Sequence, residues 1–380
     1  MKTIAYCSPL VPTEWIAAHG LRPEWLLLGA TAGLSSSVRS TAGQASSGTR
    51  PLDGSGADTA AADGRVGREG SPAAAPGTPA RRRCHLVGRG VCPYAAAILE
   101  AAAAGIPAAA VVLATTCDQV RRIADLVGRD AHLPMFLLNV PATWQTPAAR
   151  ALYAEEIERL GRFLLSLGGV RPTAGQLTEV MLRYQRARTV AVAARNRMPA
   201  RRFAETLIAA RSSGQAPSEP VEHCAAADSG GPPGRVPLAL LGGPLVRQDY
   251  DLFDLVERAG GSIVLDASEG GCRTLPAPFD TRQMAADPLT ALGAAYFGIP
   301  DVFRRPNDPL HQWLGRELPA HGVRGIIFRR YVWCDLWHAE LHRLKQSSPV
   351  PLLEIDVADD DRPVASRTEA RIEAFLEMLR

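Results

Sequence analysis

The stretch that most constrains the fold of this chain runs from Cys92 to Arg122 (CPYAAAILEAAAAGIPAAAVVLATTCDQVRR). Cys92-Pro93 predicts the start of an Ala-rich helix that ends near Gly105, because proline favours the first helical position and glycine the residue after the last one. A short apolar strand, Ala110 to Ala114, follows, and after it comes a turn with Cys117-Asp118. Both cysteines therefore lie at turns between strands and helices. In an open parallel sheet such turns face the crevice in which ligands bind.

A third cysteine has the same local setting far downstream. Val323 to Tyr331 (VRGIIFRRY) predicts a strand, and Cys334-Asp335 follows it before another helical stretch. Thiolates select zinc, copper(I) or iron–sulfur clusters, and a set of three leaves one metal position open for chemistry. The alternative is three buried, unreactive thiols, since free cysteine is common in apolar interiors. The spacing of these residues leaves both interpretations open.

Composition and charge exclude several classes of protein. The chain has 380 residues, 46% of them hydrophobic, and a formal net charge of +3, with no basic stripe that would indicate nucleic-acid binding. The N-terminal MKTIAYCSPL has too short an apolar run for a secretory signal, and no later run approaches the roughly 18 apolar residues of a membrane span. We therefore expect a cytoplasmic protein whose seven cysteines are reduced rather than paired in disulfides.

The order of predicted elements divides the chain into two α/β domains. Alternating strands and helices predict a parallel sheet in each of them. Between them, apolar residues at i, i+3, i+4 and i+7 from Ala149 to Leu167, and again around Leu177, predict a helical lobe. The expected boundaries are an N-terminal α/β domain at 1–148, the helical lobe at 149–211, a flexible linker at 212–235 and a C-terminal α/β domain at 236–380.

Two parts of the N-terminal domain have patterns that predict different kinds of structure. The chain opens as β-α-β, with strands at Lys2–Tyr6 and Glu24–Gly29 on either side of a helix that begins near Pro12. From 31 to 83, Gly, Ser, Ala, Thr and Pro dominate, and few large apolar side chains are present. Such a segment cannot offset the entropy lost on ordering, so we predict a disordered insertion at 31–83.

In the C-terminal domain, the strand Pro237–Leu241 is followed by Gly242-Gly243. A strand followed by two glycines invites comparison with phosphate-binding loops, but the full dinucleotide and P-loop patterns are both absent. We assign these glycines to a tight turn.

Several segments of the chain resemble one known family. They are, in order, CSPLVPTEWIAAHGLRP, CPYAAAILEAAAAG, TTCDQVRRIADL, LLGGPLVRQDYDLFDLVERAGGSIVLD, GIIFRRYVWCD, and PLLEIDV leading to RTEARIEAFLEML. In number, order and spacing they resemble the family of the 2-hydroxyacyl-CoA dehydratase component D and the benzoyl-CoA reductase subunits. The resemblance implies two Rossmann-like parallel-sheet domains with a helical lobe between them. It also implies a [4Fe–4S] cluster held by three cysteines, and Cys92, Cys117 and Cys334 match those ligands by position.

The same resemblance implies an activity and partners. The chain would be the iron–sulfur subunit of a 2-hydroxyacyl-CoA dehydratase-like lyase that works anaerobically on an acyl-CoA thioester. An ATP-hydrolysing activator protein delivers one electron, the thioester carbonyl becomes a ketyl radical anion, and the 2-hydroxyl leaves as water. The family pairs two related subunits, so we expect a homologous second subunit or a homodimer.

Two alternatives remain beside the dehydratase. One is a benzoyl-CoA reductase-like or double-cubane-cluster reductase, which would use further thiols such as Cys7, Cys84 and Cys272. The other is a non-catalytic subunit that carries the cluster or serves as a structural partner. Counting iron per chain and assaying turnover with an added activator separate these possibilities.

Ser8 is the candidate catalytic side chain. It lies in the turn after the first predicted strand, at the sheet edge that also carries Cys117. Its hydroxyl or a backbone amide of that turn could donate a hydrogen bond to the thioester oxygen as negative charge develops there. The alternative is that Ser8 caps the helix that begins near Pro12, because serine is common before helices.

Overall fold

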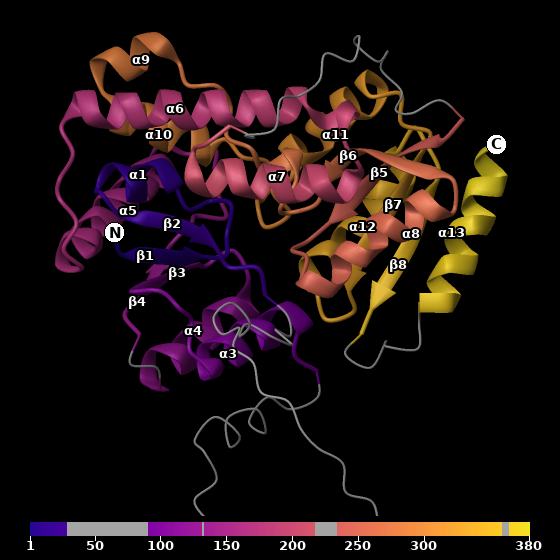
Figure 1. Ribbon diagram of the computed structural model, residues 1–380, viewed down its shortest axis with the longest axis horizontal. Helices are drawn as coiled ribbons and strands as arrows, with labels where there is room; N and C mark the ends of the chain where they lie inside the picture. The colour runs from indigo at the N-terminus through magenta and orange to yellow at the C-terminus, as the bar shows by residue number, and fades with distance from the viewer. Residues whose placement is uncertain (29–89, 131–132, 217–233, 359–364) are drawn as a thin grey trace, which may run out of the picture.

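The computed structural model describes residues 1–28, 90–130, 133–216, 234–358 and 365–380, and two four-stranded parallel sheets form within these ranges (Figure 1). The first sheet has the order β2-β1-β3-β4 and the second the order β6-β5-β7-β8. All of their strand pairs are parallel. The predicted fold class, α/β with two parallel-sheet domains, is confirmed. The strands are β1 (Thr3–Tyr6), β2 (Arg22–Trp25), β3 (Ala110–Ala114), β4 (Met135–Leu138), β5 (Val236–Gly242), β6 (Gly261–Ala267), β7 (Gly325–Tyr331) and β8 (Leu352–Val357).

The second strand differs from its prediction. It was expected at Glu24–Gly29 but spans Arg22–Trp25, where Thr3 pairs with Arg22 and Tyr6 with Trp25. The hydrophobic run Trp25–Leu28 suggested a later strand, but pairing with β1 ends at Leu26, whose N–H donates to the Tyr6 carbonyl at 2.8 Å. Pro23 is tolerated because β2 is an edge strand, where one side of the backbone has no partner to lose.

Helices cover both faces of the first sheet. Ile4, Tyr6 and Val112 point into a core shared with α1, α5 and α10, whereas Ala5, Val111 and Leu113 point into a core shared with α3 and α4. This alternation follows from the period of two residues along a strand. The helices are α1 (Thr13–Ala18), α3 (Pro93–Ala104), α4 (Asp118–Asp130), α5 (Pro147–Ser166) and α10 (Pro288–Phe297).

The second sheet is enclosed in the same way, with α8 and α13 on one face and α11 and α12 on the other. Strands β6 and β7 are buried along their whole length, as expected of parallel strands covered on both faces. Besides α10, the helices that follow β5 are η2 (Arg247–Tyr250), α8 (Asp251–Arg258), η3 (Cys272–Thr274), α9 (Thr281–Ala286), α11 (Asp308–Ala320), α12 (Asp335–Ser347) and α13 (Ala365–Leu379).

A helical layer joins the two sheets. Helices α6 (Ala174–Ala193) and α7 (Ala200–Ser213), with η1 (Arg195–Arg197) between them, lie across both halves at the top of the view in Figure 1. The buried Arg188 of α6 forms an ion pair with Glu14 of α1 at 2.5 Å, and Tyr296 of α10 donates to the same carboxylate at 2.6 Å. Helix α10 follows β6 in the chain yet packs on the first sheet, so the two halves share a core.

Three sequence expectations lie wholly or partly outside the described ranges. They are the disordered insertion at 31–83, most of the linker at 212–235, and the cysteines Cys84 and Cys224. Among the helices that the structure describes, none combines the length and apolar character needed to cross a membrane.

Candidate functional site

The carboxyl ends of the two sheets meet at one cavity of about 60 Å³. In each sheet the strand order changes direction at one point, between β1 and β3 in the first and between β5 and β7 in the second. Open parallel sheets bind ligands at these switch points, because the loops after the two central strands diverge there. The cavity is lined by Cys7, Ser8, Cys92, Tyr94, Ala95, Ala114, Thr116, Cys117, Val120, Gly243, Pro244, Glu269, Asp301, Val302, Tyr331, Cys334, Leu336 and Trp337.

The structure brings the three candidate cysteines together in this cavity. Cys92 comes from the turn before α3, Cys117 from the turn after β3 and Cys334 from the turn after β7, so two thiols belong to the first half and one to the second. Cys7 lines the cavity as well, whereas Cys272 does not and packs beside α6 and α7 instead.

Each of the three thiols lies at the N-terminus of a helix. Cys92 is the N-cap of α3 and Cys334 the N-cap of α12, while Cys117 directly precedes α4. Amides of the first helical turn lower the pKa of each thiol, those of Tyr94 and Ala95 at Cys92, of Gln119 and Val120 at Cys117, and of Trp337 at Cys334, although neither Cys92 nor Cys334 makes a capping hydrogen bond. Such amides and the helix dipole favour negative charge on sulfur.

Burial opposes that charge. It raises the pKa of Cys92 to about 11 and that of Cys334 to about 12, and it also raises the pKa of Cys117. The neighbouring sulfurs add to the shift, since Cys92 and Cys117 both raise the pKa of Cys334. Without a cation between them, the three thiols are therefore neutral near pH 7. A positive centre that accepts thiolates would reverse this, because metal ligation favours the deprotonated form.

Gln119 links the three cysteine-bearing turns. It follows Cys117 by two residues, and its side-chain oxygen accepts a hydrogen bond from the Cys92 N–H at 2.6 Å. Its side-chain nitrogen donates to the Trp333 carbonyl at 3.1 Å, one residue before Cys334. One amide group therefore fixes the Cys92 turn relative to the Cys334 turn, across the boundary between the two halves.

Glycine residues allow β7 and the Trp337 side chain to approach the end of β5 closely. A Cβ atom on Gly242 would lie 2.0 Å from the carbonyl oxygen of Arg329 on the neighbouring strand, and one on Gly243 would lie 3.1 Å from the Trp337 side chain. The two glycines at the end of β5 therefore permit the close approach of β7 and α12, and with it the position of Cys334. The tight turn expected at both glycines is therefore wrong for Gly242, which is the last residue of the strand and pairs with Arg329 of β7.

A comparison with known protein families covers most residues of this cavity. Residues 11–379 match the family model described as 2-hydroxyglutaryl-CoA dehydratase, D-component. The chain belongs to this D-component family. No curated protein matches it at a significant level. The family supports a 2-hydroxyacyl-CoA dehydratase-like component, and its model spans Cys92, Cys117 and Cys334 but begins after Ser8.

Ser8 is buried in this D-component family member and lines the cavity. Its Oγ accepts a long hydrogen bond, 3.4 Å, from the Leu10 N–H. The N-cap of α1 is Pro12, and no side chain caps that helix. The capping alternative is therefore wrong, because the turn 8–11 separates Ser8 from the first helical amides. A catalytic role for Ser8 stays a prediction.

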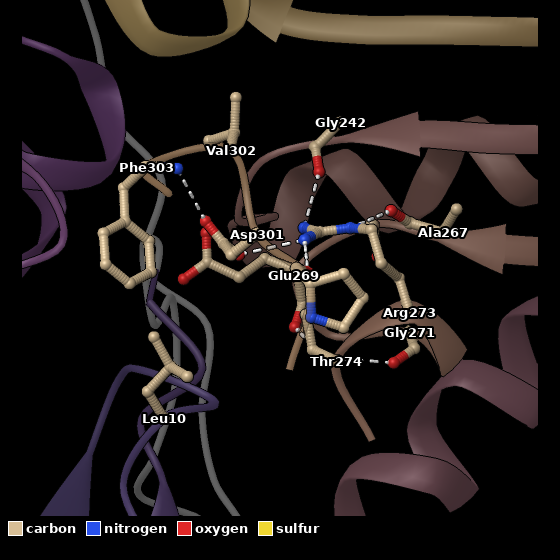
Figure 2. A network of polar contacts seen from close by, with 12 residues as sticks. Leu10, Gly242, Ala267, Glu269, Gly271, Arg273, Thr274, Asp301, Val302 and Phe303 are labelled. Atoms are coloured by element: carbon tan, nitrogen blue, oxygen red, sulfur yellow. Dashed lines mark hydrogen bonds and ion pairs between the residues drawn. The ribbon is translucent and has the colours of Figure 1, made fainter. Parts of the chain in front are cut away.

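The D-component site contains an acidic network that the sequence did not indicate. Asp301 pairs with Arg273 at 2.9 Å, and Arg273 also donates to the carbonyls of Ala267 and Pro300 (Figure 2). Glu269, in the turn after β6, lies next to Asp301 in this view. A signal for Glu269 was available, since it follows a buried strand as the cysteines do. Asp301 had none, because it comes from an irregular segment distant in sequence.

Proposed function

We propose that the chain is the iron–sulfur subunit of a 2-hydroxyacyl-CoA dehydratase-like lyase, with a [4Fe–4S] cluster bound by Cys92, Cys117 and Cys334. The observation that carries the proposal is the convergence of these thiols, from three separate turns, on one cavity between the two sheets. Membership of the D-component family supports the reaction class.

The residues present fit such a cluster. Three thiols at the N-termini of helices on one cavity match the ligand chemistry of iron–sulfur proteins, in which Cys thiolates hold the irons. Among the residues that the structure describes, no group of three or more His, Cys, Asp or Glu side chains is arranged to hold a metal ion. That finding argues against a mononuclear site. A cluster does not need its ligands to share one metal atom, because each thiolate binds a different iron.

The reaction we propose is loss of water from a 2-hydroxyacyl-CoA. When bound, the cluster supplies a single electron, received from an ATP-hydrolysing activator protein, to the thioester carbonyl of the substrate, which becomes a ketyl radical anion. The electron-rich ketyl carbon then expels the hydroxyl of the neighbouring C2, which is otherwise a poor leaving group. The protein contributes position and electrostatics.

Two features of the chain support this chemistry. Tyr94, Tyr331 and Trp337 are buried in the cavity wall and limit the access of water. The turn with Ser8 offers a hydroxyl and backbone amides for the developing oxyanion. A homologous second subunit, or a second copy of this chain, would complete the assembly.

The test is anaerobic purification followed by iron and acid-labile sulfide analysis, electron paramagnetic resonance and turnover assays. We expect about four irons and four sulfides per chain, as for one [4Fe–4S] cluster. With an activator protein, ATP and a reductant, the protein should convert a 2-hydroxyacyl-CoA into the 2-enoyl-CoA. About twice that iron content would favour the double-cubane alternative, and a loaded protein without turnover alongside any subunit would favour a non-catalytic role.

A further inference from the structure

The backbone of Glu269 is hydrogen-bonded at both its N–H and its carbonyl, whereas its side chain makes no hydrogen bond within the described residues. Its N–H donates to the Gly243 carbonyl at 3.2 Å, and its carbonyl accepts from the Thr274 hydroxyl at 2.8 Å. The turn requires glycine at 271, because a Cβ atom there would lie 2.3 Å from the Asp266 carbonyl oxygen. A tightly specified turn therefore delivers this one carboxyl group to the wall of the thiol cavity.

The Glu269 carboxyl group has no polar partner. Within the part of the chain that the structure describes, no hydrogen bond or ion pair reaches it, and Figure 2 shows it beside Asp301 with its end toward Leu10 and Phe303. Leu10 belongs to the turn after β1, so the carboxyl points from the second half toward the first. A carboxyl group in such a place is available to a ligand.

The positive charge near Glu269 belongs to Arg273, which already has other partners. Arg273 pairs with Asp301 and bonds carbonyl oxygens of its surroundings, so Glu269 lies next to a carboxylate rather than a free cation. Burial raises the pKa of Glu269 to about 8, and the charge of Asp301 adds to the rise, while Arg273 and Arg211 oppose it. The other titratable groups that face Glu269 are Cys7, Tyr94, Cys117 and Cys334, and a negative charge on Glu269 raises the pKa of each of them.

We infer that Glu269 is the proton donor and acceptor of the dehydration, an inference that rests on the proposed function. Its neutral carboxyl group gives a proton to the 2-hydroxyl of the acyl-CoA as the C2–O bond breaks, and the bonding pair leaves with oxygen as water. The resulting carboxylate then takes the proton from C3, and the C3–H pair becomes the C2=C3 bond. Glu269 returns to its neutral form, and the single electron that entered the thioester carbonyl is given back by the enoyl-CoA product, so protons and electrons balance over one turnover.

A general acid of this kind needs to hold its proton at the working pH and to lie within reach of the leaving group. Asp301 is not available for this role, because its carboxyl oxygens are occupied by Arg273 and by the Phe303 N–H. Three of the four cavity thiols bind iron in the proposed enzyme, and burial raises the pKa of the fourth, Cys7, to about 12, too far above neutral pH for efficient proton transfer. Glu269 is the cavity residue that combines a free carboxyl with a neutral state near pH 7.

The test uses cluster-loaded, full-length protein and the variant Glu269→Gln, which keeps the shape of the side chain but cannot transfer a proton. We expect turnover to fall about 10²- to 10⁴-fold, the usual contribution of general acid–base catalysis, with iron content and KM unchanged. The wild-type rate should fall as pH rises through about 8, because the carboxyl group loses its proton there. Glu100→Gln on the exposed surface of α3 is the matched control and should change neither property.

A second readout does not depend on turnover. Infrared spectroscopy of the same proteins should show a protonated carboxyl band that titrates near pH 8 in the wild type and is absent from Glu269→Gln. In Asp301→Asn the band should titrate at lower pH, because a neighbouring negative charge has been removed. This shift identifies the titrating group as the carboxyl beside Asp301, and the loss of turnover in Glu269→Gln then assigns it the proton transfer.

The outcomes separate the two proposals. Wild-type turnover that Glu269→Gln retains, or a titrating band that survives in that variant, overturns the role of Glu269 and leaves the dehydratase intact. A protein that carries a cluster but does not dehydrate any 2-hydroxyacyl-CoA ends both proposals, whatever the infrared band shows. Should Glu269→Gln fail to fold by circular dichroism, Glu269→Asp takes its place, with the same band expected at a shifted midpoint.

Discussion

The two halves of this protein have the same strand order and offer different chemistry at the same edge. Among the described residues that line the cavity, the first half contributes Cys7, Ser8, Cys92 and Cys117 and no charged side chain. The second half contributes one candidate ligand, Cys334, together with the carboxyl groups of Glu269 and Asp301. A shared topology therefore fixes where functional residues lie but not which residues they are. In our proposal the first half supplies most of the ligands for electron transfer, and the second half moves protons.

The largest effect should come from the ligands. Replacement of Cys92, Cys117 or Cys334 by Ala should abolish the bound cluster or leave a damaged one, because each removes one of three thiolates. Iron, sulfide and the electron paramagnetic resonance signal measure the loss. Cys272→Ala is the matched control, since this thiol lies outside the cavity. Unaltered iron and sulfide in all three ligand variants would disprove the assignment.

A smaller effect on rate should follow from Ser8→Ala in the first half. If its hydroxyl donates to the thioester oxygen, turnover per loaded cluster should fall about 10²- to 10³-fold. Stability should change little, because the hydroxyl accepts only one long hydrogen bond in the folded chain. Kinetics and a thermal melt on the same sample measure both quantities. Undiminished turnover would leave Ser8 without a catalytic role and would restrict the oxyanion donor to a backbone amide.

The contact between the halves is probed by Gln119. Gln119→Ala removes both hydrogen bonds and should weaken cluster binding about 10- to 100-fold, the usual cost of losing a residue that orients metal ligands. Gln119→Glu keeps an acceptor for the Cys92 N–H but cannot donate to the Trp333 carbonyl. We expect it to fall between Ala and wild type in competition assays with an iron chelator. Equal cluster retention by all three proteins would show that this amide does not position the ligands.

The smallest effect concerns stability and pH. The pKa of Glu269 is raised in the folded protein, to about 8, so the folded state holds this proton where the unfolded state has lost it. Stability from this proton is complete below the unfolded pKa of about 4.3 and is lost as pH rises through the folded value. Glu269→Gln, which keeps a neutral side chain, should therefore lose less stability than the wild type between pH 6 and 9. Parallel pH dependences in denaturant titrations would contradict a raised pKa.

The features that depend on local sequence patterns could be predicted from the sequence. The positions of Cys117 and Cys334 followed from topology, because each cysteine comes directly after an apolar strand and parallel strands end at a common edge. Local patterns were sufficient for that step. The two parallel-sheet domains followed from the same alternation of strands and helices.

The remaining parts of the site depended on contacts distant in the chain. Asp301 lies in an irregular segment, and Arg273 in a one-turn helix, so neither has a periodic pattern to reveal its partner. Gln119 looked like an ordinary residue of a helical first turn. The packing of helix α10 on the first sheet depends on how the chain crosses between the halves, so no local pattern could indicate it. The start of β2 was missed because the apolar run after it resembled a strand more than Arg22–Trp25 did.

The cavity wall is drawn from both halves, and this has a consequence for assembly. A group bound by Cys92, Cys117 and Cys334 together acts as a crosslink between the two sheets, and its binding free energy also resists their separation. Loading the site and closing the molecule are then one equilibrium. A protein depleted of its bound group should open first along the surface that Gln119 crosses, while each sheet keeps its own fold. Hydrogen exchange at the edges of that surface would record the opening long before either sheet unfolds.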